Sequence, residues 1–232
     1  MKKIINLFLF FSMLFCFAGC SKTDISSHSS DITKTSDTLV TASKNNTESE
    51  YGADDILLSV LYNKKPFITA KGTTVYLKDY KPIYKYPEDV DYYEKDTVFN
   101  PRDYTYVDLD KDGKEELIVA ESPYADTYLI LHKENEKIYG YSLYIRWFEA
   151  LKKDGSFMGS GGAQIHDYNT ISFKENTYSI SVFSKYYFIG ENSDDNVFEI
   201  NGKKVSLEEI KQFAEEWDKR PEAEWTKFEQ TN

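Results

Sequence analysis

The chain has 232 residues, with 28 basic and 39 acidic side chains and a formal net charge of −11. An acidic balance of this size argues against nucleic acid and anionic membrane surfaces as ligands, because both carry negative charge. The two cysteines, Cys16 and Cys20, lie close together near the N-terminus, so the rest of the chain has no thiol and no internal disulfide.

The first nineteen residues have the layout of a secretory signal peptide. Lys2 and Lys3 precede an apolar run from Ile4 to Ala18, which is shorter than the roughly 20 residues that a membrane-spanning helix needs. We expect residues 1–19 to direct export and then to be removed. That removal takes away two lysines and no acid, so the net charge would change from −11 to −13.

The apolar run ends in Phe17-Ala18-Gly19-Cys20. These four residues resemble the lipobox of bacterial lipoproteins, with Phe at the position where Leu is commonest. The resemblance implies that Cys20 carries a diacylglycerol on its sulfur and an acyl group on its amine, and that it holds the protein on the extracytoplasmic face of the cell membrane. Two or three acyl chains anchor a protein far better than one. The alternative is an ordinary cleaved signal in which Cys20 has no role.

Residues 20–50 are predicted to follow the anchor as a disordered tether. Fourteen of the thirty residues from 21 to 50 are Ser or Thr, and none is Phe, Tyr or Trp. Such a segment cannot bury enough apolar surface to offset the entropy lost on ordering.

Residues 51–232 are expected to form a single domain. We predict an α+β fold that is mostly antiparallel β-sheet, with a short N-terminal helix and a C-terminal helix. Apolar residues share one side of 54–62, which predicts the first helix. The second begins at Ser206, because Ser206 and Glu209 have the spacing of a capping box.

Short apolar and aromatic runs between polar turns predict the strands. The predicted strands are residues 104–107, 117–120, 127–132, 138–151, 167–173, 177–188 and 197–200. Three hairpins are expected, across 133–137, across 174–176 and across Asn201-Gly202. The dipeptide Asn201-Gly202 accepts the positive φ angles of a tight turn.

The stretch YVDLDKDGKEELIV, residues 106–119, has the pattern of a calcium-binding loop at residues 108–116. Acidic side chains at alternate positions of a coiled loop can converge on one cation, and calcium takes six to eight oxygen ligands. A glycine at the sixth position permits the turn that aims the next carbonyl at the same point. The predicted ligands are Asp108, Asp110, Asp112, the Lys114 carbonyl and Glu116.

The loop more closely resembles the nine-residue D-x-D-x-D-G-x-x-[DE] calcium loops that join strands in integrin-type repeats than it does a helical EF-hand. The twelfth position, where the EF-hand supplies a bidentate glutamate, is Val119, so we expect weak binding, with a Kd on the order of 10⁻⁴–10⁻³ M. Two alternatives stay open: a solvated hairpin turn at Asp112-Gly113, and a different metal. The absence of a nearby His or Cys in the sequence disfavours zinc.

The glycine-rich stretch 152–168, KKDGSFMGSGGAQIHDY, is predicted to be a loop. It contains Ser160, His166 and Asp167, but neither the G-x-S-x-G of a nucleophile elbow nor a GK[ST] phosphate loop, so a hydrolytic triad is disfavoured. His132 is expected to have a structural role. The acidic turn 191–196 is expected to be solvated, with completion of a cation shell as the alternative.

The order of these motifs is similar to that of a group of uncharacterised lipoproteins from low-GC Gram-positive bacteria. The similarity rests on the aspartate loop, on DGSFMGSGGA at 154–163, on INGKKVSLEEIKQFAEEW at 200–217 and on W-x-x-F at 225–228. It implies a location and a domain boundary, and no chemistry.

We therefore expect a membrane-anchored, extracytoplasmic lipoprotein with a calcium-stabilised binding domain. Its ligand would be a cell-wall or host polymer or a protein, and not nucleic acid. The rival function is a cell-envelope hydrolase that uses acidic residues, although the sequence offers no catalytic pair whose separation can be argued.

Overall fold

The computed structural model describes residues 55–85, 92–121, 127–191 and 193–229. The chain from Glu50 to Asn232 forms one compact unit. The predicted signal peptide, the tether and Cys20 lie outside the described residues. Within the described ranges, no helix has both the length and the apolar character needed to cross a membrane.

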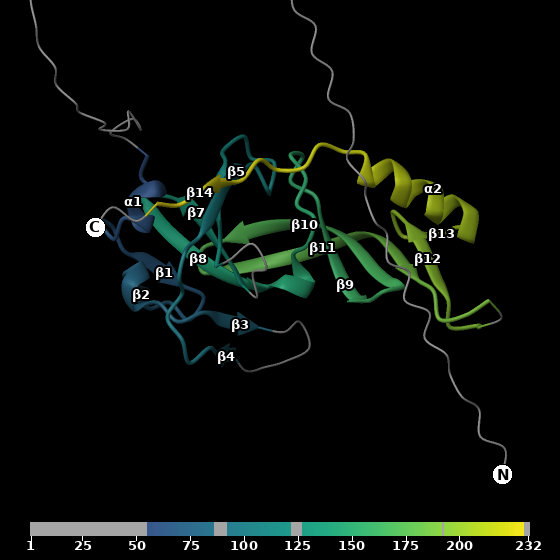
Figure 1. Cartoon of the computed structure of the whole chain (residues 1–232), viewed down its shortest axis with the longest axis horizontal. Helices are drawn as coiled ribbons and strands as arrows, with labels where there is room; N and C mark the ends of the chain where they lie inside the picture. Colours follow the sequence, from purple (N-terminus) through teal and green to yellow (C-terminus); the bar gives the residue numbers. More distant parts are fainter. Residues whose placement is uncertain (1–54, 86–91, 122–126, 192, 230–232) are drawn as a thin grey trace, which may run out of the picture. The chain divides into compact units, whose positions relative to one another are not determined.

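The larger sheet has seven strands in the order β14-β5-β6-β7-β8-β1-β2 (Figure 1). Its strands are β1 (Phe67–Thr69), β2 (Thr74–Val75), β5 (Asp103–Val107), β6 (Glu116–Ala120), β7 (Thr127–Glu134), β8 (Lys137–Tyr144) and β14 (Thr226–Lys227). All neighbouring pairs are antiparallel except β1 and β8, which run parallel. The sheet is therefore mixed rather than purely antiparallel.

The smaller main sheet has five antiparallel strands in the order β13-β12-β11-β10-β9. These strands are β9 (Phe157–Gly162), β10 (Ile165–Lys174), β11 (Thr177–Tyr187), β12 (Val197–Ile200) and β13 (Lys203–Lys204). A separate hairpin consists of β3 (Ile83–Lys85) and β4 (Tyr92–Glu94). Strands make up 45% of the described residues and helices 14%, which confirms a mostly β fold.

The helices confirm the prediction of one short helix near the N-terminal end of the domain and one near its C-terminal end. They are α1 (Leu58–Leu61), α2 (Leu207–Asp218) and the 3₁₀ turns η1 (Leu77–Asp79) and η2 (Ile145–Trp147). Helix α2 lies beside β12 and begins with both bonds of the capping box between Ser206 and Glu209 (Figure 1). Helix α1 is shorter than predicted.

Two hydrophobic cores lie on the two faces of the seven-stranded sheet. Side chains alternate along a strand, so neighbours such as Leu117 and Ile118 enter different cores. The first core packs α1 and Phe67 against Leu117, and the second packs Phe157 against Ile118. Burial on both faces explains why all five residues of β6 are buried.

Two predicted segments differ from the structure. The strand predicted at 138–151 ends at Tyr144, because the chain there turns into η2. The loop predicted over 152–168 contains β9 and the start of β10. Gly159, Gly161 and Gly162 lie within β9, where Gly159 stands opposite Asp167, whereas Gly155 lies in the turn before this strand.

Candidate functional site

The aspartate loop connects β5 to β6, and the last pair of these strands is Val107 and Glu116. Lys111 and Gly113 have φ angles of 64° and 86°, in the left-handed region that lets a short loop coil. The predicted strands on either side of the loop are confirmed.

Asp108, Asp110 and Asp112 each offer a carboxylate oxygen, and these oxygens lie within 4.8 Å of one another. Calcium–oxygen bonds of about 2.4 Å would place two ligand oxygens at most about 4.8 Å apart, so the spacing suits such an ion. One oxygen of Asp108, Oδ1, is buried without a hydrogen-bond partner among the described residues. Its other oxygen accepts from the Gly113 amide at 3.0 Å. This group of acids can hold a metal.

The negative charge of Asp112 is partly balanced by a neighbouring residue of the loop, Lys114. The Asp112 Oδ1 accepts from the Lys114 amide at 2.8 Å, and its Oδ2 lies 2.9 Å from the Lys114 Nζ. These bonds from Lys114 lower the pKa of Asp112. The alternative of a solvated polar turn therefore keeps a physical basis, because part of the loop's negative charge is balanced by Lys114.

Glu116, the last predicted ligand, is 1% exposed and faces His132. Its Oε1 lies 2.9 Å from the His132 Nδ1, while its Oε2 accepts from the Leu109 amide at 2.8 Å. Burial raises the pKa of Glu116, and the hydrogen bond to His132 partly opposes that effect.

Asp110, Glu116 and His132 form a second group that can hold a metal, again with ligand atoms within 4.8 Å. The pairing of β6 with β7 brings Glu116 and His132 together, since Leu117 stands opposite Leu131. The expectation that no histidine lies near the loop is therefore wrong. A mixed nitrogen and oxygen ligand set is one that zinc accepts. The described metal-capable groups include no residue of the acidic turn 191–196.

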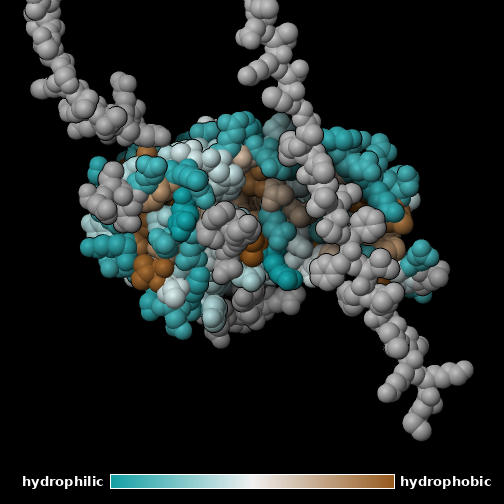
Figure 2. Space-filling view, in the orientation of Figure 1, coloured by the Kyte–Doolittle hydropathy of each residue, from teal (hydrophilic) through white to brown (hydrophobic). Residues whose placement is uncertain are grey.

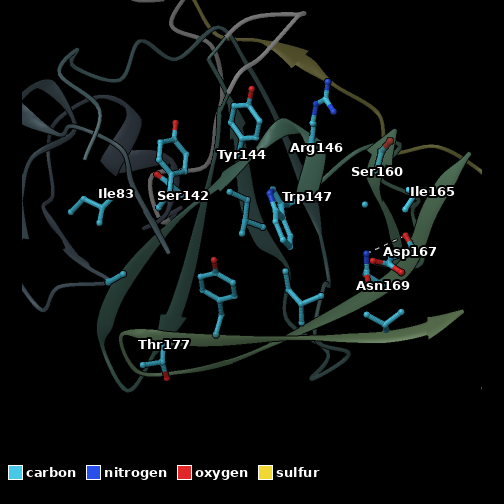
Figure 3. A pocket seen from close by; sticks show the side chains of 18 of the residues that line it. Ile83, Ser142, Tyr144, Arg146, Trp147, Ser160, Ile165, Asp167, Asn169 and Thr177 are labelled. Atoms are coloured by element: carbon cyan, nitrogen blue, oxygen red, sulfur yellow. Dashed lines mark hydrogen bonds between the residues drawn. The ribbon is translucent and has the colours of Figure 1, made fainter. Parts of the chain in front are cut away.

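A cavity of about 650 Å³ lies between β8 and η2 on one side and β9, β10 and β11 on the other. Residues from β3 also line it. Most of its wall is aromatic or aliphatic (Figure 3). The large apolar and aromatic lining residues are Ile83, Tyr84, Leu143, Tyr144, Trp147, Ile165, Tyr178, Ile180, Val182 and Tyr187.

Asp167 is the one carboxylate among the described residues that line this cavity. The Tyr187 hydroxyl lies 2.8 Å from Asp167 Oδ1 and 3.1 Å from Oδ2. Burial raises the pKa of Asp167, although the Tyr187 hydroxyl and the nearby charge of Lys185 oppose that shift. Arg146 is the one basic residue in the described lining, and Figure 3 shows its guanidinium directed away from Asp167.

Ser160, His166 and Asp167 do not form a hydrolytic triad. His166 and Asp167 are neighbours on β10, so their side chains point to opposite faces of the sheet. Asp167 therefore cannot orient the His166 ring. The Ser160 hydroxyl already bonds to Gly162: it donates to the Gly162 carbonyl oxygen at 3.2 Å and accepts from the Gly162 amide at 3.3 Å.

The outer surface seen in Figure 2 carries its hydrophobic residues in separate small areas between hydrophilic ones. No large apolar patch is visible on the described part of this face. The aromatic and aliphatic wall of the cavity offers a ligand with an apolar body a complementary surface.

The cavity was not anticipated from the sequence, because its wall combines six separate elements. The one local signal is the glycine-rich stretch 159–162, whose composition predicts a loop rather than a strand. A Cβ atom at Gly159 would lie 3.1 Å from the Asn169 Nδ2 and 3.9 Å from the Asp167 Cβ. A side chain at this position would therefore crowd the Asn169 amide at the acidic end of the cavity.

Comparisons with known protein families, with curated proteins and with solved structures give no match to this chain.

Proposed function

We propose that the chain is a binding protein held on the extracytoplasmic face of the cell membrane, and that it takes its ligand into the cavity between the two main sheets. The observation that carries this proposal is the cavity itself, with its volume of about 650 Å³ and its aromatic wall. Ligand pockets of soluble proteins have volumes of about 300–1,000 Å³ and are mostly apolar, with a few polar groups that orient the ligand.

The cavity favours binding over hydrolysis by acidic residues. Hydrolysis of a glycosidic bond by the usual acid mechanism requires two carboxyl groups, about 5–10 Å apart. The described lining contributes Asp167 alone. The carboxylates of the aspartate loop belong to a different part of the chain and are not among the lining residues.

The binding proposal is tested by screening the purified protein against a library of small fragments by ligand-observed NMR. Val182 lines the cavity and is 42% exposed, so Val182→Trp should fold and narrow the cavity. Val98 is 44% exposed and is not among the lining residues, which makes Val98→Trp the matched control. We expect fragments that bind the wild type and Val98→Trp, and that lose at least tenfold in affinity with Val182→Trp. Equal binding by all three proteins would refute the cavity as the site.

We propose that the aspartate loop holds calcium as a structural ion. The support is the convergence of three carboxylates and the buried, unpartnered Oδ1 of Asp108. In this proposal Asp108, Asp110, Asp112 and the Lys114 carbonyl bind the ion. Glu116 contributes directly or through water. Two arrangements compete with it: the solvated turn, in which Lys114 balances Asp112, and a transition metal on the group that contains His132.

Thermal melts with and without calcium test the loop. At a calcium concentration about ten times Kd, binding adds about 1.4 kcal/mol of stability. That gain corresponds to an increase in Tm of about 3–6 °C for a domain of this size. Asp108→Asn/Asp110→Asn should abolish the increase. Asp194→Asn/Asp195→Asn removes two exposed acids elsewhere and should keep it.

The same melts distinguish the competing arrangements. A wild type whose Tm does not respond to either calcium or zinc would leave only the solvated turn. A response to zinc alone, lost in His132→Ala, would assign the ion to Asp110, Glu116 and His132 instead.

The lipid anchor is tested with Cys20→Ala. The lipobox resemblance leads us to expect that this variant is released into the medium or keeps its signal peptide uncleaved. Membrane fractionation and mass spectrometry of the N-terminus measure both outcomes. Unchanged processing together with unchanged membrane retention would contradict the anchor.

A further inference from the structure

One end of the cavity has an excess of hydrogen-bond acceptors. Asn169 is 4% exposed, and its Nδ2 donates to the Asp167 carbonyl oxygen at 3.2 Å (Figure 3). Its Oδ1 is buried and has no partner among the described residues. A buried acceptor without a donor makes the folded protein less stable. A ligand that donates a hydrogen bond at this point would restore that stability.

The Asp167 carboxylate also has unused capacity. The Tyr187 hydroxyl lies near both carboxylate oxygens, but a hydroxyl has one hydrogen and donates fully to one oxygen at a time. An ionised carboxylate has about four acceptor sites. Lys185 stands opposite Asp167 on β11 but lies 3.9 Å from Glu199, its nearest described acidic partner. Asp167 therefore brings both charge and free acceptor sites to the cavity.

The remainder of the wall suits an apolar body. Tyr84, Tyr144, Trp147 and Tyr178 line the cavity. Figure 3 shows the rings of Tyr144 and Trp147. Ile165, Ile180 and Val182 add aliphatic surface. Aromatic faces attract cations as well as apolar groups, because the ring face is electron-rich.

We propose that the cavity binds an amphipathic primary amine, with its ammonium group at Asp167 and the Oδ1 of Asn169 and its apolar body against the aromatic wall. This proposal rests on the proposed binding function of the same cavity. It makes the class of ligand more specific, on the basis of the chemistry of the two acceptors.

The two acceptors select an ammonium with hydrogen atoms to donate. A primary ammonium has three donors and one positive charge, so it can satisfy Asn169 and neutralise Asp167 together. A quaternary ammonium has no donor and would leave Asn169 unsatisfied. A neutral alcohol would leave the Asp167 charge unbalanced, and a carboxylate or phosphate would be repelled by it.

Three probes of the same shape test the proposal: 4-phenylbutylamine, 4-phenylbutan-1-ol and 4-phenylbutyrate. Titration calorimetry with the purified protein at pH 7 should show that the amine binds at least tenfold more tightly than the alcohol or the carboxylate. Asp167→Asn keeps the shape of the side chain and removes its charge, so it should weaken amine binding at least tenfold. Glu215→Gln removes an exposed acid from α2 and should change nothing. Circular dichroism verifies that each variant is folded.

The outcomes separate this proposal from the one it rests on. If the alcohol binds as tightly as the amine, or if Asp167→Asn binds the amine as the wild type does, the amine proposal is overturned while ligand binding in the cavity stands. If none of the three probes binds, the amine proposal is also overturned. The fragment screen with Val182→Trp then decides on the cavity independently.

Discussion

At the scale of single residues, the cavity holds a carboxylate in a place that is unfavourable to its charge. Burial raises the pKa of Asp167 above its ordinary value, and the Tyr187 hydroxyl, Lys185 and His166 offset only part of that effect. The stability that such a group contributes is fully present below the ordinary pKa of an aspartate. It is lost as the pH rises through the higher pKa that the group has in the folded protein. The ionised form of Asp167 therefore destabilises the ligand-free protein.

This sign gives a prediction for Asp167→Asn. At pH 7 the variant should have a higher Tm than the wild type, because it removes the buried charge. The difference should shrink as the pH is lowered toward 3, where the wild-type carboxyl is protonated in both the folded and the unfolded chain. Thermal melts followed by circular dichroism from pH 3 to 8 measure the difference. A lower Tm for the variant at pH 7 would show that the bond from Tyr187 to the charged carboxylate outweighs burial.

A second prediction concerns Trp217, which joins α2 to the five-stranded sheet. Its side chain is fully buried, its ring packs 5.0 Å from that of Tyr168, and its Nε1 donates to the Ser156 Oγ at 3.0 Å. The Lys152 Nζ lies 4.7 Å from its ring centre. Trp217→Ala should reduce the free energy of unfolding by about 3–5 kcal/mol, because it leaves a cavity and removes a partner from Ser156.

Urea unfolding measures that loss. Trp225→Ala is the control, because Trp225 is 39% exposed and its replacement should cost much less. If Trp217→Ala costs as little as Trp225→Ala is expected to cost, α2 contributes little to the stability of the five-stranded sheet.

At the scale of elements, sequence patterns predict the features that depend on residues close together in the chain. Asn201 and Gly202 adopt φ angles of 51° and 73°, as a tight hairpin turn requires, and the capping box of α2 forms with both of its bonds. Each of these features depends on residues within about four positions of one another. Patterns of this range therefore predicted the hairpins and the start of the last helix.

Features that depend on distant pairing could not be predicted in this way. Nothing local indicates that β1 lies parallel to β8, since the pair Ile68 and Tyr139 is formed by residues far apart in the chain. The same limit applies to the site. His132 reaches Glu116 only through the register of β6 and β7, and the cavity exists only after β9, β10 and β11 fold against β8 and η2.

The parallel pair gives a prediction at Gly140. A Cβ atom at this position would lie 2.3 Å from the Cδ2 of Phe67, which is 1% exposed and packs edge-on against Tyr80. Because the ring has little room to move, Gly140→Ala should cost about 1–3 kcal/mol through overpacking. Gly190→Ala is the control, since a Cβ there meets nothing within 4 Å. Urea unfolding compares the two, and an equal stability would mean that β1 shifts without cost.

At the scale of the whole domain, the two hydrophobic cores share the seven-stranded sheet. Leu117 and Ile118 are adjacent, and each supports a different core, so loss of either core exposes one face of the same strand. The buried strands between the cores can therefore persist only if both layers are present. This arrangement differs from two separate subdomains, which would each have a sheet of their own to stabilise.

Because the two hydrophobic cores share one sheet, we predict a single cooperative unfolding transition. Leu61→Ala removes buried volume from the first core and Phe157→Ala from the second. We expect losses of about 2–5 kcal/mol for each variant. The buried Trp217 packs against Tyr168 of the five-stranded sheet, whereas far-ultraviolet circular dichroism reports on all strands. Fluorescence and circular dichroism should therefore give the same urea midpoint in both variants. Leu61→Ala could instead lower the urea midpoint measured by circular dichroism and leave the midpoint measured by fluorescence unchanged. That result would show that the five-stranded sheet folds without the first core.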